Sequence, residues 1–102
     1  MTNKIEHRFD IAMMDIYHRA RNEARYTATR FLQMLHEYRG LETARRLLHS
    51  STVSEGYTAL WERGRLDLTV EALILQPEWN DLFTNDEREI ARQRLQDYGY
   101  AL

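Results

Sequence analysis

The sequence predicts an all-α protein, a compact single-domain bundle of about six helices joined by short loops. The 102-residue chain contains one proline and four glycines, so few positions interrupt a helix. Apolar residues recur at helical spacing, without the sustained alternation of apolar and polar residues that is typical of strands. A chain of this length forms one domain, which we place at residues 1–102.

Three helices are predicted in the first half of the chain. The first covers about residues 5–23, where apolar side chains recur every three or four positions. The second extends over residues 27–39, with Thr27 as its N-cap and Gly40 as the residue that ends it. The third covers residues 42–49 and follows closely, because no linker separates it from the second.

A fourth helix is predicted to begin near Ser54 and to end at Gly64. It carries Tyr57 and Trp61, which are four residues apart and therefore share one helical face. We expect both rings to be largely buried against the helix that follows.

The fifth helix is predicted over residues 67–75, with Asp67 as its cap and Pro77 enforcing its end. The last helix opens with Thr84-x-x-Glu87, which matches a capping box. In that motif each side chain accepts a hydrogen bond from the backbone N–H of the other residue.

The fifth helix is apolar on both faces, which is typical of a helix inside a protein. Glu71 lies among these apolar residues, and a buried carboxylate must be paired or protonated because desolvating its charge alone is costly. Arg63 and Arg65, just upstream, are the expected partners, and together with Glu71 they form a candidate structural ion pair. A functional carboxylate and a fully exposed one are the alternatives.

Residues that carry chemistry are few. The chain has no cysteine, so it has neither disulfides nor thiolate ligands. The single Asp15-x-x-His18 pair falls short of the paired motifs that a carboxylate-bridged metal site needs. The glycines are isolated and the serines lack the context of an activated nucleophile. We therefore expect no catalytic residues, no metal and no cofactor, and hence no enzyme.

Charge is unevenly distributed along the chain. Residues 1–50 carry a net charge of +3 and residues 51–102 a net charge of −5. Either the two halves of one domain attract each other, or a polarised surface docks a partner or a second copy. Nucleic-acid binding would use a basic face of the first half, formed by Arg19, Arg21, Arg25, Arg30, Arg39, Arg45 and Arg46. A helix-turn-helix over residues 42–62 would bring carboxylates towards the phosphates.

The first helix offers a candidate interaction surface. Ile11 and Met14 point away from its main apolar stripe, toward the side of His18. Apolar residues on an otherwise charged face suggest a second contact surface, and methionine adapts well to different partners. Ile11, Met14 and His18 are therefore predicted to meet a partner protein or a second copy. Coverage by residues 98–102 is the alternative.

The sequence also predicts a cytoplasmic protein without a membrane partner. No apolar run approaches the length of a membrane helix, and charged residues interrupt the N-terminus where a signal peptide would be apolar.

Several segments resemble a group of small hypothetical bacterial helical proteins. They are RFLQML (30–35), GLETARRLL (40–48), GYTALWERGRLDLTVEALIL (56–75), LF (82–83) and ARQRLQDYGY (91–100). Similar segments occur beside nuclease-type domains. The resemblance implies a bacterial helical module, but it implies no reaction and no catalytic residue.

Together these observations favour a small non-catalytic protein–protein interaction or accessory module. Self-association, or service in a nucleic-acid-processing or defence system, would be compatible with that role. Direct nucleic-acid binding through the arginine-rich N-terminal half is the alternative. No small-molecule substrate is evident from the sequence.

Overall fold

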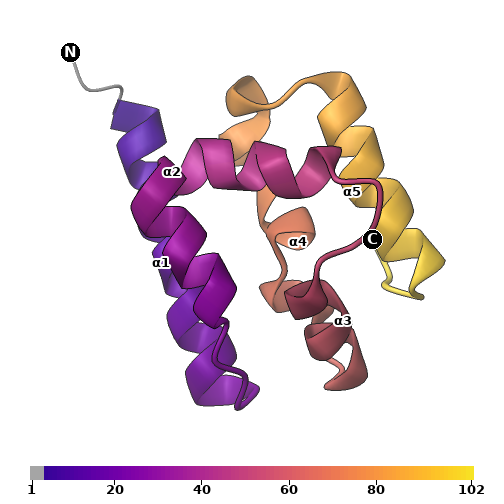
Figure 1. Cartoon of the computed structure of the whole chain (residues 1–102). Helices are drawn as coiled ribbons and strands as arrows, with labels where there is room; N and C mark the ends of the chain where they lie inside the picture. The colour runs from indigo at the N-terminus through magenta and orange to yellow at the C-terminus, as the bar shows by residue number, and fades with distance from the viewer. Residues whose placement is uncertain (1–3) are drawn as a thin grey trace.

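The computed structural model describes residues 4–102. Its helices are α1 (Lys4–Glu23), α2 (Thr29–His49), α3 (Glu55–Glu62), the 3-10 helix η1 (Leu66–Leu68), α4 (Val70–Ile74), the 3-10 helix η2 (Pro77–Leu82) and α5 (Asn85–Asp97). No strand occurs within the described residues, so the all-α prediction is confirmed (Figure 1). No helix in this part of the chain combines the length and the apolar character needed to cross a membrane.

Helix α2 changes direction at Arg39, where the backbone has φ 66° and ψ −178°. Its first half runs beside α1 and its second half crosses toward α5 (Figure 1). The predicted break near Gly40 is therefore confirmed, but the residue with a positive φ is Arg39. Backbone angles of this kind are nearly restricted to glycine, so Arg39 is strained.

Gly40 is needed for a different reason, the close approach of α1. A Cβ atom at Gly40 would lie 2.8 Å from Oδ1 and 3.2 Å from Cα of Asp10. The Gly40 N–H donates to Oδ1 of Asp10 at 2.7 Å, and Nη2 of Arg39 donates to Oδ2 at 2.9 Å. A carboxylate at a helix N-terminus is favourable, so Asp10 caps the second half of α2 from the neighbouring helix.

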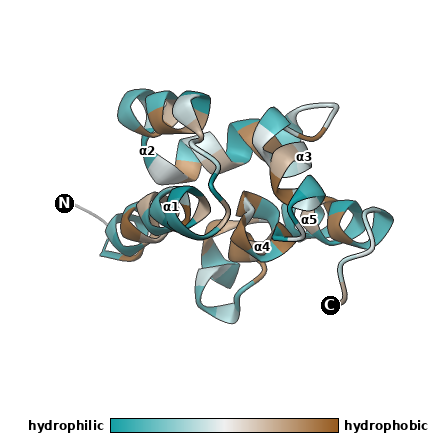
Figure 2. Ribbon diagram, turned by 90° about the horizontal axis from the view of Figure 1, so that it is seen from below, coloured by the Kyte–Doolittle hydropathy of each residue, from teal (hydrophilic) through white to brown (hydrophobic). Residues whose placement is uncertain are grey.

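The main core lies where α1, α2, α4, α5 and η2 meet. Phe9 and Ile74 are fully buried there, and Trp79 and Phe83 pack edge-on against Phe9 with ring centroids 5.2 and 5.4 Å apart. Figure 2 shows α4 coloured as hydrophobic near the centre, whereas the outer helices alternate between hydrophobic and hydrophilic residues. The central position predicted for this segment is confirmed.

The helix predicted over residues 67–75 is shorter than expected. Helix α4 begins only at Val70, because the Thr69 hydroxyl accepts a hydrogen bond from the N–H of Ala72 at 3.2 Å. Thr69 is thus the N-cap in place of Asp67, whose carboxylate is held by Arg65 at 3.0 Å. Asp67 lies in η1, which turns the chain before α4 starts.

Other predicted helix ends vary in accuracy. The capping box of Thr84 and Glu87 is confirmed, with both reciprocal hydrogen bonds present. Helix α2, in contrast, starts at Thr29 without a side-chain cap, so Thr27 is not its N-cap. Pro77 follows α4 as predicted and itself opens η2.

Candidate interaction surfaces and buried charges

Glu71 is buried, with 3% of its surface exposed, as predicted. Its partner, however, comes from α5, because Nη1 of Arg94 donates to Oε2 of Glu71 at 3.0 Å. The prediction that Arg63 or Arg65 pairs with Glu71 is wrong. Burial raises the pKa of Glu71 above its ordinary value, and hydrogen bonds, including the one from Arg94, offset only part of this effect.

Arg63 and Arg65 turn toward the end of α1 instead. Nη2 of Arg65 lies 2.7 Å from Oε1 of Glu23, and the guanidinium of Arg63 lies 5.3 Å from the centre of the Tyr26 ring. The intervening 3-10 turn separates both arginines from Glu71, which points toward α5. Sequence proximity was therefore a poor guide to this ion pair.

The guanidinium of Arg94 also closes the C-terminal end of α2. It donates to the backbone carbonyl groups of Leu47 at 3.1 Å, Leu48 at 3.3 Å and Ser50 at 2.7 Å. Carbonyl groups at the end of a helix lack partners within the helix. One side chain therefore joins α2, α4 and α5.

A second buried carboxylate connects α2 and α5. Oε2 of Glu87 lies 2.8 Å from Nε2 of His49 and 3.6 Å from Nε of Arg45, while Oε1 accepts from the N–H of Thr84. Burial by itself raises the pKa of Glu87, but the hydrogen bonds from Thr84 and His49 and the charge of Arg45 outweigh it, so the pKa lies below its ordinary value. The capping box identified Glu87, but no sequence signal assigned His49 to it.

The predicted surface on α1 is only partly apolar. Ile11 is 58% exposed, and His18 is exposed with its ring edge-on to Tyr17 at 5.4 Å. Met14 is half-buried and packs against the main core. The C-terminal residues do not cover this surface, because Tyr98 and the residues after it lie beside α5, away from α1 (Figure 1). Ile11 is thus the one large apolar side chain that α1 exposes within the described residues.

A larger apolar surface lies at α3 and the end of α5. Trp61 is 45% exposed, so the prediction that it is largely buried is wrong, whereas Tyr57 is buried as predicted. Tyr98 packs edge-on against both, with ring centroids 5.1 Å from Tyr57 and 5.3 Å from Trp61. We call Trp61 and Tyr98 the aromatic patch. Tyr57 forms its buried base, and Tyr98 shields that base from solvent.

Acidic residues flank the aromatic patch. Glu62 follows Trp61 and Asp97 precedes Tyr98 in the chain, and both are exposed. Neither forms an ion pair with a described residue, although Asp97 accepts a hydrogen bond from Gln93 at 2.8 Å. Each residue of the aromatic patch therefore has an exposed acidic neighbour in the chain.

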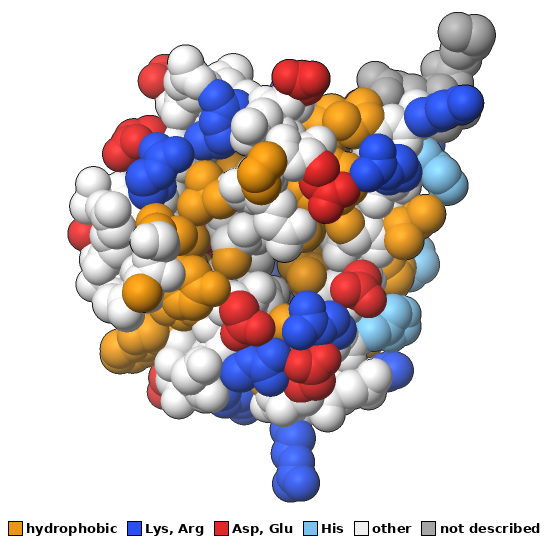
Figure 3. All heavy atoms as spheres, turned by 180° about the vertical axis from the view of Figure 1, so that it is seen from behind, with side chains coloured by type: hydrophobic (Ala, Val, Ile, Leu, Met, Phe, Trp, Pro, Cys, Tyr) orange, Lys and Arg blue, Asp and Glu red, His pale blue; other side chains and the backbone are white. Residues whose placement is uncertain are grey.

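Most arginines of the first half are already paired. Five of the eight form ion pairs, namely Arg8 with Glu78, Arg19 with Glu23, Arg39 with Asp10, Arg45 with Glu87 and Arg46 with Glu42. Arg21, Arg25 and Arg30 form no ion pair with any residue that the structure describes. Figure 3 shows acidic and basic side chains intermingled on the back of the molecule, without a continuous basic area.

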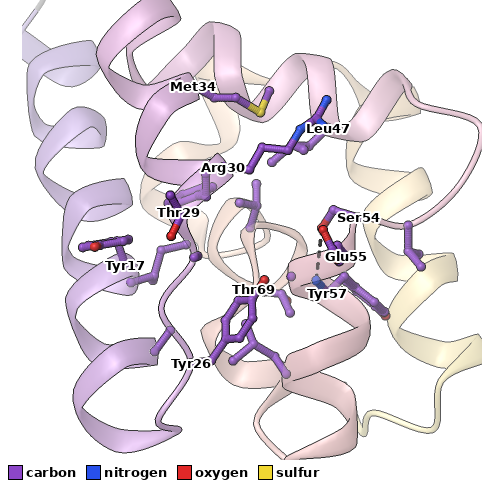
Figure 4. A pocket seen from close by; sticks show the side chains of 18 of the residues that line it. Tyr17, Tyr26, Thr29, Arg30, Met34, Leu47, Ser54, Glu55, Tyr57 and Thr69 are labelled. Atoms are coloured by element: carbon purple, nitrogen blue, oxygen red, sulfur yellow. Dashed lines mark hydrogen bonds between the residues drawn. The ribbon is translucent and has the colours of Figure 1, made fainter.

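A cleft of about 1060 Å³ separates the first half of α2 from α3. Its lining includes buried apolar side chains from α1, α3, η1 and α4, namely Ile16, Ala20, Leu60, Leu68 and Val70. In the close-up of Figure 4, Arg30 extends from α2 across the cleft, while Ser54 and Glu55 lie on the opposite wall. Sequence reasoning missed this cleft, because its lining comes from segments that are far apart in the chain.

Comparison with known proteins identifies no relative of this chain. The chain matches no protein-family model, and no curated protein or solved structure matches it either. Among residues 4–102, no three His, Asp or Glu side chains come together in a group that would hold a metal ion. The residues and their geometry are therefore the basis for a functional proposal.

Proposed function

We propose that the chain is a non-catalytic protein–protein interaction module of the cytoplasm that docks through the aromatic patch. The 45% exposure of Trp61 beside Tyr98 is the observation that carries this proposal. Tryptophan and tyrosine are the residues that most often dominate the binding free energy of protein interfaces. An exposed tryptophan on a packed aromatic base is rigid, so little side-chain entropy is lost when a partner covers it.

The acidic chain neighbours of the aromatic patch indicate which partner fits. Glu62 and Asp97 have no cationic partner among the described residues, so lysine or arginine side chains on the partner would face them. Charges at the rim of an interface mainly raise the association rate and exclude wrong partners. The partner is therefore expected to offer an apolar pocket for the indole ring, surrounded by basic residues.

Self-association through α1 would use a smaller apolar contact than docking through the aromatic patch. Ile11 is exposed, but Met14 is partly buried in its own chain and His18 is polar. A single exposed isoleucine supplies little apolar area compared with a tryptophan. This is why we place the main partner at the aromatic patch.

Affinity capture with three baits tests the proposal. Wild type, Trp61→Ala and Ile11→Glu are immobilised, and extract of the source organism is passed over each. We expect one protein to be recovered by wild type and by Ile11→Glu and to be lost with Trp61→Ala. Equal recovery by all three baits would remove the aromatic patch as the docking surface.

Direct nucleic-acid binding stays the second candidate, because Arg21, Arg25 and Arg30 form no ion pair with a described residue. Arg21 does contact the Tyr17 ring, with 5.8 Å between the guanidinium carbon and the ring centre. Binding to phosphates weakens steeply with added salt, whereas an apolar interface barely responds. A salt titration of the interaction therefore separates the two candidates.

A further inference from the structure

Two opposite charges face the cleft between α2 and α3 without pairing. Arg30 lies in the first turn of α2, and Glu55 is the first residue of α3. Both are exposed, and neither forms an ion pair with any described residue. Figure 4 places them on opposite walls of the cleft. A guanidinium and a carboxylate that share a cleft but stay apart are each available to a ligand.

The surface of the cleft is about as polar as it is apolar, and hydroxyl groups are among its polar groups. Buried Leu60, Leu68 and Val70 and half-buried Met34 supply apolar parts of the lining. The Ser54 hydroxyl accepts a hydrogen bond from the N–H of Tyr57 at 3.0 Å, so its own proton can be donated to a ligand. The cleft therefore offers apolar contacts together with a hydrogen-bond donor.

The other charged residues of the lining do not cancel this arrangement. Glu71 is neutralised by Arg94, and Arg46 is held by Glu42 at 3.2 Å and by the Tyr38 ring at 3.9 Å. Glu37, which is exposed and without an ion pair among the described residues, adds a second acid to the lining.

We propose that this cleft binds a short peptide segment of a partner protein. Apolar side chains of the segment lie on the floor, an acidic group pairs with Arg30 and a basic group pairs with Glu55. A simple anion would satisfy Arg30 but would bring no cation to Glu55. The volume of about 1060 Å³ is large enough for several side chains, since ligand pockets commonly measure about 300–1,000 Å³. Neither Trp61 nor Tyr98 lines the cleft, although Tyr57, the buried base of the aromatic patch, does.

A displayed library of random dodecapeptides, selected on the immobilised wild-type chain, tests the proposal. We expect the enriched peptides to share apolar residues flanked by one acidic and one basic residue. Their dissociation constants are then measured by fluorescence anisotropy with wild type and variants. Arg30→Gln and Glu55→Gln should each weaken binding about two- to fivefold, as expected for exposed ion pairs. Met34→Trp, which places a larger side chain in the lining of the cleft, should abolish binding.

Matched controls lie on α5, where Arg92 and Glu89 pair with each other at 2.6 Å outside the cleft. Arg92→Gln and Glu89→Gln should leave the dissociation constants unchanged. Failure to enrich any peptide, or equal binding by the Arg30→Gln and Glu55→Gln variants, would overturn the proposal. Peptides that are lost with Trp61→Ala but kept by the cleft variants would overturn it too, while supporting the aromatic patch as the docking surface.

Discussion

Arg94 and Glu71 form an ion pair, but among the described residues only Arg94 has further hydrogen-bond partners on other elements. The Nη1–Oε2 distance is 3.0 Å, and the same guanidinium also donates to backbone carbonyl groups of Leu47, Leu48 and Ser50. Without Glu71, Arg94 would keep these carbonyl partners. Without Arg94, Glu71 would be an unpaired carboxylate in the interior. The corner formed by α2, α4 and α5 therefore depends on Arg94 more than on Glu71.

Truncating Arg94 should be far more damaging than neutralising Glu71. We expect Arg94→Ala to lower the free energy of unfolding by about 3–5 kcal/mol, because it leaves a buried charge unpaired. Glu71→Gln keeps a hydrogen-bond acceptor and should cost only about 1 kcal/mol. Urea denaturation of both variants measures the difference. Equal losses would show that Arg94 has no role beyond the ion pair.

The pKa values of two glutamates should lie on opposite sides of the ordinary carboxyl value of 4.5. Hydrogen bonds from Arg19 and then Arg65 lower the pKa of Glu23 to about 2. Its contribution to stability is present above pH 4.5 and is lost as the pH falls toward 2. Burial raises the pKa of Glu71, so the folded state binds its proton more tightly than the unfolded state. Its contribution to stability therefore decreases as the pH rises above 4.5.

An NMR titration with carbon-13-labelled glutamate reads both groups in one experiment. The Glu71 signal should shift at a higher pH than the signals of exposed glutamates, and the Glu23 signal at a lower one. A common midpoint for the two would contradict the contacts described for them.

Because of the kink in α2, substitutions at two neighbouring residues should change the free energy of unfolding in opposite directions. Arg39→Gly should raise the free energy of unfolding by about 1 kcal/mol, since glycine relieves the backbone strain and the exposed pair with Asp10 is worth little. Gly40→Ala should lower it by about 1–3 kcal/mol, because the new Cβ meets Asp10. Thermal unfolding followed by circular dichroism measures both. A stabilising Gly40→Ala would mean that α1 moves away freely.

Two substitutions on α1 separate exposed from packed apolar residues. Ile11→Glu should change the free energy of unfolding by at most about 0.5 kcal/mol, as surface substitutions do. Met14→Glu should cost more, because Met14 packs against the main core. Sedimentation velocity of wild type and Ile11→Glu then reports self-association without a stability artefact. Identical sedimentation of the two at high concentration would exclude association through Ile11.

Sequence patterns predicted the helices well where the signal is local. The first helix is correct to within one residue, and the capping box of Thr84 and Glu87 is present, because apolar spacing and capping act over a few residues. The burial of Glu71 was also predictable, since its apolar neighbours flank it in the chain. These features depend on contacts that the sequence itself places together.

Features that depend on contacts between distant residues were missed. Glu71 and Arg94 are 23 residues apart, and Asp10 reaches Gly40 across 30 residues. Trp61 was predicted to be buried because it shares a helical face with Tyr57. Tyr98, which follows α5, instead occupies the space beside Tyr57, and part of the indole stays in solvent. Such competition for space is not visible in a local pattern.

Alanine substitutions at Trp61 and Tyr57 should differ in their effect on the stability of the fold. Tyr57→Ala should lower the free energy of unfolding by about 3–5 kcal/mol, as for a buried aromatic residue, whereas Trp61→Ala should lower it by only about 1 kcal/mol. Chemical denaturation of the two variants under the same conditions measures the difference.

The most direct test of whether the aromatic patch is the docking surface is the affinity of the Trp61→Ala variant for the captured partner. The dissociation constant is measured by calorimetry on a sample whose free energy of unfolding is known. We expect the binding free energy to weaken by about 2 kcal/mol or more, as for a residue that dominates an interface, while the fold stays intact. Unchanged affinity in a folded Trp61→Ala variant would contradict the proposal.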